Sequence, residues 1–283
     1  MSAVEAGSRD AVSGAIGISA VDVCICTYHR PAVIEALRSL SRQQGCDGIR
    51  LRVVVADNAG DTTARELIET TARELGLDTV YVHAPARNIS IARNACLDAA
   101  IAEWFAFLDD DEIASPIWLS ALLREAASGQ WDAVLGPVQA VYPKTAPAWV
   151  HAGNFHSTRP VFVRGRIETG YTGNVLIRRA TVTREGLRFR TELGRSGGED
   201  EDFFNRLRDA GGRIGFARGA VAYETIRAER TSLRWLIRRN FRAGQTYAAR
   251  LQARSASRLA PSRALALPAA KMGACAVGAA VPA

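Results

Sequence analysis

Cysteine is sparse in this chain of 283 residues. The five cysteines are scattered, odd in number, and show none of the spacings that hold zinc. Cys24 and Cys26 alternate within an apolar stretch, so we expect both side chains on one face of a strand, as small core residues. This usage indicates a reducing compartment.

Segments that would direct the chain into or across a membrane are also lacking. Residues 1–19 have no basic start and no continuous apolar core, so they predict a flexible N-terminal tail and not a signal peptide. Residues 265–283 are apolar, but two prolines and a lysine interrupt them, and the stretch falls short of the ~20 residues that span a bilayer. Residues 253–283 are therefore expected to form a weakly ordered tail.

Lysine is nearly absent, and the positive charge is unevenly placed. The formal net charge of +7 rests almost wholly on arginine. From Thr225 onward there are eleven basic residues and one acid, Glu229, whereas acids slightly outnumber bases in the rest of the chain. The C-terminal region is therefore expected to meet an anionic surface, either membrane headgroups or nucleic acid.

Residues 104–112 join five apolar residues to four acids, which are Asp109, Asp110, Asp111 and Glu112. The apolar run predicts a strand buried on both faces. Adjacent carboxylates repel one another most strongly where water is partly excluded, so a cation is expected beside them, and oxygen ligands suit Mg²⁺ or Mn²⁺. A helix cap is the competing interpretation because Ser115-Pro116 follows, but a cap needs one acid and not four.

Strand and helix patterns alternate through residues 20–128. Apolar, β-branched runs predict strands at 21–28, 51–56, 79–83 and 104–108, with helices between and after them. This order implies an α/β fold whose mostly parallel sheet is flanked by helices. The residues that follow three of these strands are then expected to meet at one sheet edge, where such folds bind nucleotides.

No glycine-rich phosphate loop follows the first predicted strand, neither G-x-G-x-x-G nor a Walker sequence. A nucleotide at this edge would therefore need a metal ion to neutralise its diphosphate. The acidic stretch can supply the ligands for that ion.

The regular alternation is lost in the second half of the chain. Residues 131–142 predict one strand or a bent pair, 143–160 a long loop, and 175–177 a further strand. A glycine-rich loop at 194–198 leads to a second acidic group, Glu199-Asp200-Glu201-Asp202, ahead of apolar residues at helical spacing. These acids are expected at a helix N-terminus, where the dipole favours ionised carboxylates. Plain capping is the competing explanation.

Six stretches, in order, resemble family 2 glycosyltransferases of the GT-A fold, and among them bacterial succinoglycan and exopolysaccharide glycosyltransferases. They are Val23 to Pro31, Val54 to Asn58, Asn88 to Asn94, Phe107 to Glu112, Thr172 to Asn174 and Gly198 to Phe203. Each stretch alone is weak evidence for the family, but all six in the family's order are strong evidence. The resemblance implies a GT-A-type, Rossmann-like sheet and a hexosyltransferase activity.

The resemblance implies roles on the donor side. Thr27, Tyr28 and Arg30 would form the first nucleotide-contacting loop. Asp57 would recognise the base, and Arg93 would contact the donor through its guanidinium fork.

It also implies a metal site and a base. Asp109 and Asp111 would be the outer members of a D-x-D motif that binds metal and ribose, and Asp110 is a third candidate because the register within three aspartates is ambiguous. Asp200 would be the catalytic base of an inverting transfer. Such a transfer needs two separate acidic sites, because one carboxylate deprotonates the acceptor hydroxyl while the metal stabilises the leaving diphosphate.

Two features depart from the family's pattern. Many members carry a late histidine that ligates metal, whereas Tyr223-Glu224 stands in the comparable place here. We expect Glu224 to pair with Arg227 or Arg230, with metal ligation as the alternative. The Q-x-x-R-W motif of processive members is absent around Trp235, so a single sugar per acceptor visit is expected.

The acceptor is expected to meet the second half of the catalytic domain. Asn174 and Glu199 are secondary candidates there, with Glu224. Trp149, in the long loop, is a candidate stacking platform for a sugar ring, although burial of Trp149 in the core is an equally open interpretation.

Residues 231–251 predict one helix with an apolar stripe and three arginines spaced four residues apart beside it. A basic amphipathic helix of this kind suits an anionic membrane surface. The alternative is that the apolar stripe packs on the catalytic domain. An acceptor that is linked to a lipid would favour membrane contact.

The expected domains are a tail at 1–19, a GT-A catalytic domain at 20–226 with a nucleotide-binding half (20–128) and an acceptor half (129–226), a basic amphipathic helix at 227–252, and a tail at 253–283. The expected function is inverting, metal-dependent transfer of a sugar from a nucleotide-diphosphate donor to a saccharide or lipid-linked saccharide acceptor. We expect Mn²⁺ or Mg²⁺ as cofactor, no nucleic-acid partner, and a cytoplasmic protein held peripherally on the inner face of the bacterial membrane.

Three other classes compete with this interpretation. A nucleotidyltransferase would need a basic, glycine-rich loop after the first strand, which is absent. A haloacid-dehalogenase-type phosphatase would carry its aspartate after the first strand of the sheet and not the fourth. A non-catalytic membrane- or nucleic-acid-binding module would depend wholly on the arginine-rich C-terminal region.

Overall fold

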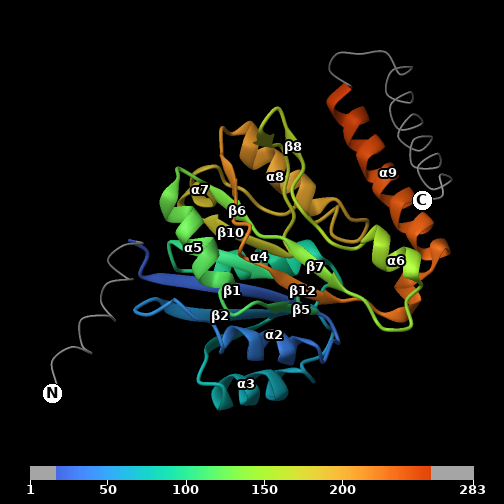
Figure 1. Cartoon of the computed structure of the whole chain (residues 1–283). Coiled ribbons are helices and arrows are strands. Elements are labelled where there is room, and N and C mark those ends of the chain that lie inside the picture. Colours follow the sequence, from blue (N-terminus) through green and yellow to red (C-terminus); the bar gives the residue numbers. More distant parts are fainter. Residues whose placement is uncertain (1–16, 256–283) are drawn as a thin grey trace, which may run out of the picture. The chain divides into compact units, whose positions relative to one another are not determined.

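The computed structural model of the protein describes residues 17–255 (Figure 1). The chain divides into two compact units between Ile226 and Arg227. Most of the two predicted tails, at residues 1–16 and 256–283, lies outside the described residues.

The first unit is built on a seven-stranded sheet with the order β11-β6-β10-β4-β1-β2-β3. Its first four strands in chain order are parallel, as the sequence predicted, and they are β1 (Ala20–Thr27), β2 (Arg50–Asp57), β3 (Asp78–His83) and β4 (Trp104–Leu108). The helices between them are α2 (Val33–Leu40), α3 (Arg65–Glu74) and α4 (Ile89–Ala99). This arrangement confirms the α/β fold with a mostly parallel sheet.

The other half of the sheet has mixed directions. Strand β10 (Asn174–Arg178) is antiparallel to both β4 and β6 (Ala133–Leu135), and β11 (Ile214–Phe216) is parallel to β6. The helices of this half are α5 (Trp118–Ser128), α7 (Arg179–Arg184) and α8 (Glu199–Asp209). The sequence patterns did not indicate α7.

A second, three-stranded sheet stands beside the first and contains β5 (Glu112–Ala114), β12 (Ala222–Thr225) and β7 (Val138–Val141). Glu112 therefore opens a strand of its own and is not the end of an acidic turn. The bent-pair interpretation of residues 131–142 is the correct one, since β6 and β7 belong to different sheets. Between the two strands, Gly136 packs against the Ala220 carbonyl, where a Cβ atom would approach to 2.4 Å.

The segment predicted as a long loop is partly structured. It contains the short helix α6 (Ala148–Gly153), and it is followed by a hairpin of β8 (Phe162–Val163) and β9 (Arg166–Ile167). Asn154 ends α6 in the left-handed backbone region, with φ of 44°.

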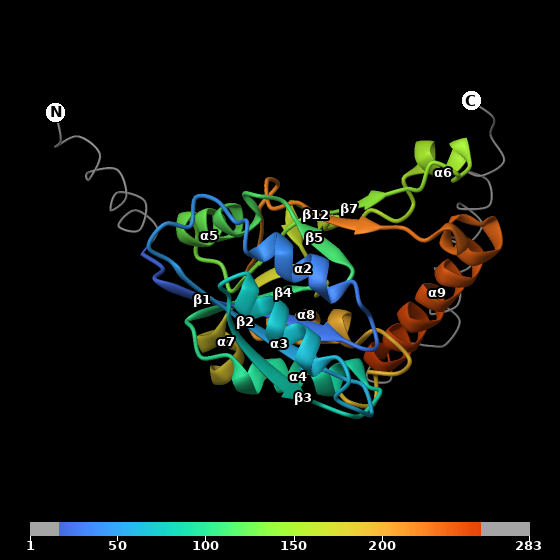
Figure 2. The same cartoon turned by 90° about the horizontal axis from the view of Figure 1, so that it is seen from below.

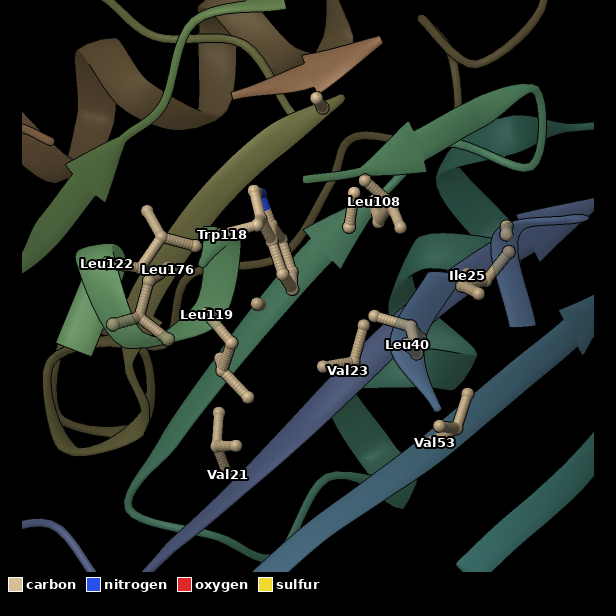
Figure 3. Close-up of a cluster of buried hydrophobic side chains, with 14 of the residues drawn as sticks. Val21, Val23, Ile25, Leu40, Val53, Leu108, Trp118, Leu119, Leu122 and Leu176 are labelled. Carbon is tan, nitrogen blue, oxygen red and sulfur yellow. The ribbon is translucent and has the colours of Figure 1, made fainter. Parts of the chain in front are cut away.

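Apolar residues fill both faces of the large sheet. Helices α2, α3 and α5 cover one face, where Leu40, Trp118 and Leu119 pack on Val23 and Val53 of the strands (Figure 3). Figure 2 shows α2 and α3 on the same side of the sheet. Helices α4, α7 and α8 cover the other face. Because both faces are buried, the strands read as continuous apolar runs, as expected of parallel sheets.

The second unit contains a short 3₁₀ turn, η1 (Ala228–Thr231), and the helix α9 (Leu233–Ser255). Leu233, Ile237 and Phe241 are spaced four residues apart on α9, and 56–60% of each is exposed. Leu236 is buried, so the predicted stripe is not uniformly solvated. In the part of the chain that the structure describes, no helix is both long and apolar enough to cross a bilayer.

Candidate active site

Three strand ends meet at one edge of the large sheet. Thr27 and Asp57 are neighbours in the β1–β2 register, and the Asn58 amide donates to the Thr27 carbonyl oxygen at 2.8 Å. The Thr27 hydroxyl donates to Asp110 at 2.8 Å, which joins the end of β1 to the acidic stretch after β4. The predicted convergence of these three segments is therefore present in the structure.

Arg30 holds two of the three consecutive aspartates. One guanidinium nitrogen donates to Asp110 at 2.8 Å and to Asp111 at 2.6 Å. Burial raises the pKa of Asp110, while Arg30 and Thr27 act in the opposite direction. The positive charge of Arg30 thus partly neutralises Asp110 and Asp111, whereas Asp109 forms no salt bridge with any residue of 17–255.

Asp109 lies with Glu112 and Glu224 in a group that we call the acid cluster. Burial raises the pKa of Asp109 to about 7, and the charges of Asp111, Asp110 and Glu224 add to the rise, whereas Arg93 lowers it. Glu112 is buried, and burial with the charges of Asp109 and Glu224 raises its pKa well above the usual range. The protein therefore only partly offsets the burial and mutual repulsion of Asp109 and Glu112.

Strand pairing builds the acid cluster. In the antiparallel register of β5 and β12, Glu112 lies directly opposite Glu224. Gly173 closes the cluster from the other side, because a Cβ atom there would lie 2.7 Å from Glu112 Oε1 and 3.2 Å from Asp109 Oδ2. Gly173, directly before β10, therefore has to be glycine, because its backbone approaches the Glu112 and Asp109 carboxylates closely. Neither this role of Gly173 nor the position of Glu112 opposite Glu224 was predicted from the sequence.

The acid cluster is not a ready-made metal centre. Among residues 17–255, no three His, Cys, Asp or Glu side chains are arranged so that they could hold a metal ion. The ligand atoms available in the cluster are nevertheless carboxylate oxygens, which suit a hard divalent cation. The pKa values of two of these carboxyl groups, Asp109 and Glu112, are raised. The assignment of Asp109 and Asp111 as metal ligands stays a prediction.

Arg93 lies between the acid cluster and the second acidic group. It donates to Glu199 Oε1 at 2.5 Å, and both side chains are buried. Burial would lower the pKa of Arg93, but the nearby charges of Asp109, Asp200 and Glu199 raise it. Asn88 positions this arginine by capping α4, as its side chain accepts from the amides of Ser90 and Ile91.

The second acidic group occupies the first turn of α8, as predicted. Gly198 precedes the helix with φ of 91°, a backbone region that favours glycine. Glu199 pairs with Arg93, whereas Asp200 accepts only the Glu201 amide and forms no salt bridge among the described residues. Within the group, Asp200 is therefore an ionisable side chain that no arginine holds.

Asp57 and Tyr28 are the remaining residues predicted to contact the donor. Asp57 is buried and accepts from the Tyr81 hydroxyl at 2.7 Å and the Ala59 amide at 2.9 Å. Tyr28 is exposed, and the Arg87 guanidinium lies 5.9 Å from the centre of its ring. Tyr81 was not identified from the sequence, although it stands in the predicted third strand.

The residues expected on the acceptor side have different environments. Asn174 is buried and its amide is fully engaged, because it accepts from Trp118 Nε1 and donates to the carbonyls of Pro137 and Ala220. This network fits a positioning role. Trp149 is 43% exposed and packs on Phe155, so burial of Trp149 in the core is wrong.

The fold and the site together define a class. They are those of a GT-A-type glycosyltransferase. The sheet is parallel in its first half and mixed in its second, an acidic stretch follows one of its strands, and a second acidic group begins a helix. Residues 22–186 match the family described as Glycosyl transferase family 2. The chain belongs to this family and is a glycosyltransferase, which excludes the phosphatase, nucleotidyltransferase and non-catalytic alternatives.

Individual proteins show the same relationship. The chain is 48% identical over 259 residues to the succinoglycan biosynthesis protein ExoM of Rhizobium meliloti (strain 1021), covering 92% of this chain and 84% of that protein. Its fold is similar to that of S. aureus TarS, with a TM-score of 0.60 at 20% identity over 86% of this chain and 41% of TarS. TarS 1-349 in complex with UDP gives a TM-score of 0.57 at 21% identity, over 81% of this chain and 63% of that one. The chain thus spans less than two thirds of these solved chains, and at such identities the likeness concerns the fold.

Proposed function

We propose that the protein transfers a sugar, with inversion, from a nucleoside-diphosphate donor to a saccharide acceptor in the synthesis of a succinoglycan-type exopolysaccharide. Two comparisons support this proposal. The relative at 48% identity is a succinoglycan biosynthesis protein, and the similar TarS fold has been solved in complex with UDP and with UDP-GlcNAc. We therefore propose a uridine diphosphate sugar as the donor.

The observation that carries the proposal is the unfavourable burial of two neighbouring carboxylates, Asp109 and Glu112, in the acid cluster. The raised pKa values of Asp109 and Glu112 mean that the folded protein holds carboxylates that a cation would stabilise. We assign Mn²⁺ or Mg²⁺ to Asp109 and Asp111, with Asp110 as the third candidate. Asp111 would bind the ion in place of its contact with Arg30. When bound, the ion neutralises the donor diphosphate.

Residues from the three strand ends and from α4 would bind the donor. Thr27, Tyr28 and Arg30 contact the nucleotide, and Asp57, oriented by Tyr81, binds the base. Arg93 contacts the donor from the floor of the site, where Glu199 fixes its guanidinium.

Asp200 removes the proton from the acceptor hydroxyl. It suits this role because it stands in the first turn of α8 and because no salt bridge restrains it among residues 17–255. The acceptor hydroxyl then attacks the sugar from the face opposite the leaving diphosphate, which inverts the configuration at the transferred carbon.

The first experiment is a panel of nucleotide-sugars scored by thermal shift, with Mn²⁺ or Mg²⁺ and with EDTA. We expect one uridine diphosphate sugar to raise the melting temperature only with metal, and Asp111→Ala to abolish the rise. Asp98→Ala is the matched control, because Asp98 is an exposed aspartate of α4 that pairs with Arg188. If Asp111→Ala responds as the wild type does, the metal assignment is wrong.

A second variant isolates the base. Asp200→Asn keeps the shape of the side chain and is expected to keep the metal-dependent donor shift while losing sugar transfer by at least about 100-fold. Retention of transfer would remove Asp200 from the base role.

We also propose that the second unit holds the protein on the inner face of the cytoplasmic membrane, close to a lipid-linked acceptor. The exposed apolar residues Leu233, Ile237 and Phe241 support this, because α9 also carries many arginines. Ile237→Ser with Phe241→Ser is expected to reduce sedimentation with vesicles that contain phosphatidylglycerol, and undiminished sedimentation would contradict the proposal.

A further inference from the structure

A cavity of about 350 Å³ lies in the first unit, and no residue of the acid cluster lines it. Its walls come from β7, from the segment between α6 and β8, and from the turn between β11 and β12. Two arginines, Arg159 and Arg218, line it together with two phenylalanines, Phe162 and Phe216. The cavity thus combines positive charge with apolar walls.

The two arginines lack protein partners. Over residues 17–255, the guanidinium groups of Arg159 and Arg218 form no salt bridge and no hydrogen bond. Other arginines of the same unit are held, as Arg52 is by Asp22 and Arg208 by Glu168. Two cations that face one cavity without a carboxylate repel each other and attract an anionic ligand.

The cavity adjoins the acid cluster through short connections. Pro137 lines the cavity, and its carbonyl accepts from Asn174, the residue after Gly173. The Tyr171 hydroxyl donates to the Gly136 carbonyl at 2.6 Å. Burial raises the pKa of Tyr171, as does the charge of Glu112, whereas that of Arg159 lowers it, so Tyr171 lies within electrostatic reach of both sites.

Charge distinguishes the two neighbouring sites. The acid cluster repels an anion unless a metal ion is present, whereas the arginine cavity attracts one without metal. A planar guanidinium binds two phosphate oxygens at once, and two such groups match the charge of a phosphate ester or a diphosphate better than that of a single carboxylate. The phenylalanines can contact an apolar chain or the face of a sugar.

We propose that this cavity binds the phosphate or diphosphate group of the acceptor, through Arg159 and Arg218. The proposal rests on the proposed function in that it assigns the anion to the acceptor. The source of the phosphate is either a lipid diphosphate that carries the saccharide or a phosphate on the saccharide itself. In both cases the cavity binds the acceptor's charged end.

The test is a direct titration by calorimetry in EDTA, which suppresses metal-dependent donor binding. The probes are geranyl diphosphate, glucose 1-phosphate and succinate. Arg159→Gln with Arg218→Gln is expected to weaken binding of the preferred phosphate probe about tenfold or more. The matched control is Arg164→Gln with Arg166→Gln, which removes two exposed arginines of the neighbouring hairpin without touching the cavity lining.

Each outcome decides between alternatives. Preference for geranyl diphosphate indicates the lipid source, and equal binding of glucose 1-phosphate indicates the saccharide source, and both support the proposal. Equal losses in the two double variants, unchanged binding in the cavity variant, or tighter binding of succinate overturn it. Because Arg159 and Arg218 have no partners to lose, all variants are expected to melt as the wild type does. If no nucleotide-sugar binds but phosphate binding persists and depends on these arginines, the proposed function fails while the cavity site stands.

Discussion

Replacement of Asp109 by Asn should stabilise the metal-free protein at alkaline pH. In the folded protein the pKa of Asp109 is raised from 3.8 to about 7, chiefly by burial. The folded state therefore holds this proton more tightly than the unfolded state does. Ionisation of the folded carboxyl is unfavourable, so the free energy of unfolding falls as pH rises from about 4 to about 7.

The structure sets the size of the effect. One pH unit between the folded and unfolded pKa values corresponds to about 1.4 kcal/mol, so the ionised Asp109 costs about 4 kcal/mol at pH 8. At pH 5 only about 1.6 kcal/mol of this cost is present. The asparagine variant avoids the ionisation, and its advantage over the wild type should grow by about 2.5 kcal/mol between pH 5 and pH 8.

The assay is urea unfolding followed by tryptophan fluorescence in EDTA at several pH values. Asp98→Asn is the control of opposite sign, because the hydrogen bond from Arg188 lowers the pKa of Asp98. That exposed pair adds stability above the unfolded pKa and loses it as pH falls, so the control variant should be slightly less stable than wild type at pH 8. An Asp109→Asn variant whose advantage is equal at pH 5 and pH 8 would refute the reasoning. Saturating Mg²⁺ or Mn²⁺ should erase the advantage if Asp109 ligates the ion.

Two further substitutions test the supporting contacts. Tyr81→Phe removes the hydrogen bond to Asp57 and should lower the free energy of unfolding by about 1.5 kcal/mol and raise the donor KM several-fold with kcat unchanged, as measured by urea unfolding and steady-state kinetics. An unchanged donor KM would show that the orientation of Asp57 does not contribute to recognition of the base. Glu199→Gln leaves the buried Arg93 without its ionic partner and should cost about 2 kcal/mol in urea unfolding, because a hydrogen bond between charged groups becomes a weaker one. A variant as stable as the wild type would show that Asp109 and the helix terminus suffice to hold Arg93.

The strands and helices of residues 20–128 could be predicted from the sequence because their signals are local. Four apolar runs alternate with helical patterns, and each buried strand ends at a polar residue that the parallel arrangement must bring to one edge. The contacts of Thr27 and Arg30 with Asp110 follow from that arrangement. The helix N-terminus at Glu199 was likewise visible, because acids preceded apolar residues at helical spacing.

Parts of the second half could not be predicted, because their elements are short or depend on pairing between residues far apart in the sequence. Helix α7 has six residues and β5 has three, which is too few to establish a period. Antiparallel insertion of β10 between β4 and β6 depends on long-range pairing that no local pattern records. The exposure of Trp149 was also undecided, since a tryptophan in a polar segment suits either a core or a surface.

The pairing of Glu112 with Glu224 shows why the acid cluster could not be found from sequence. The two residues belong to strands of three and four residues, and only the register of β5 on β12 sets them opposite each other. Like charges directly opposite in a ladder destabilise the sheet. A fold that places two such glutamates beside Asp109 therefore gives up stability. A cation bound here, as we propose, would relieve this repulsion, and the relief would contribute to its affinity.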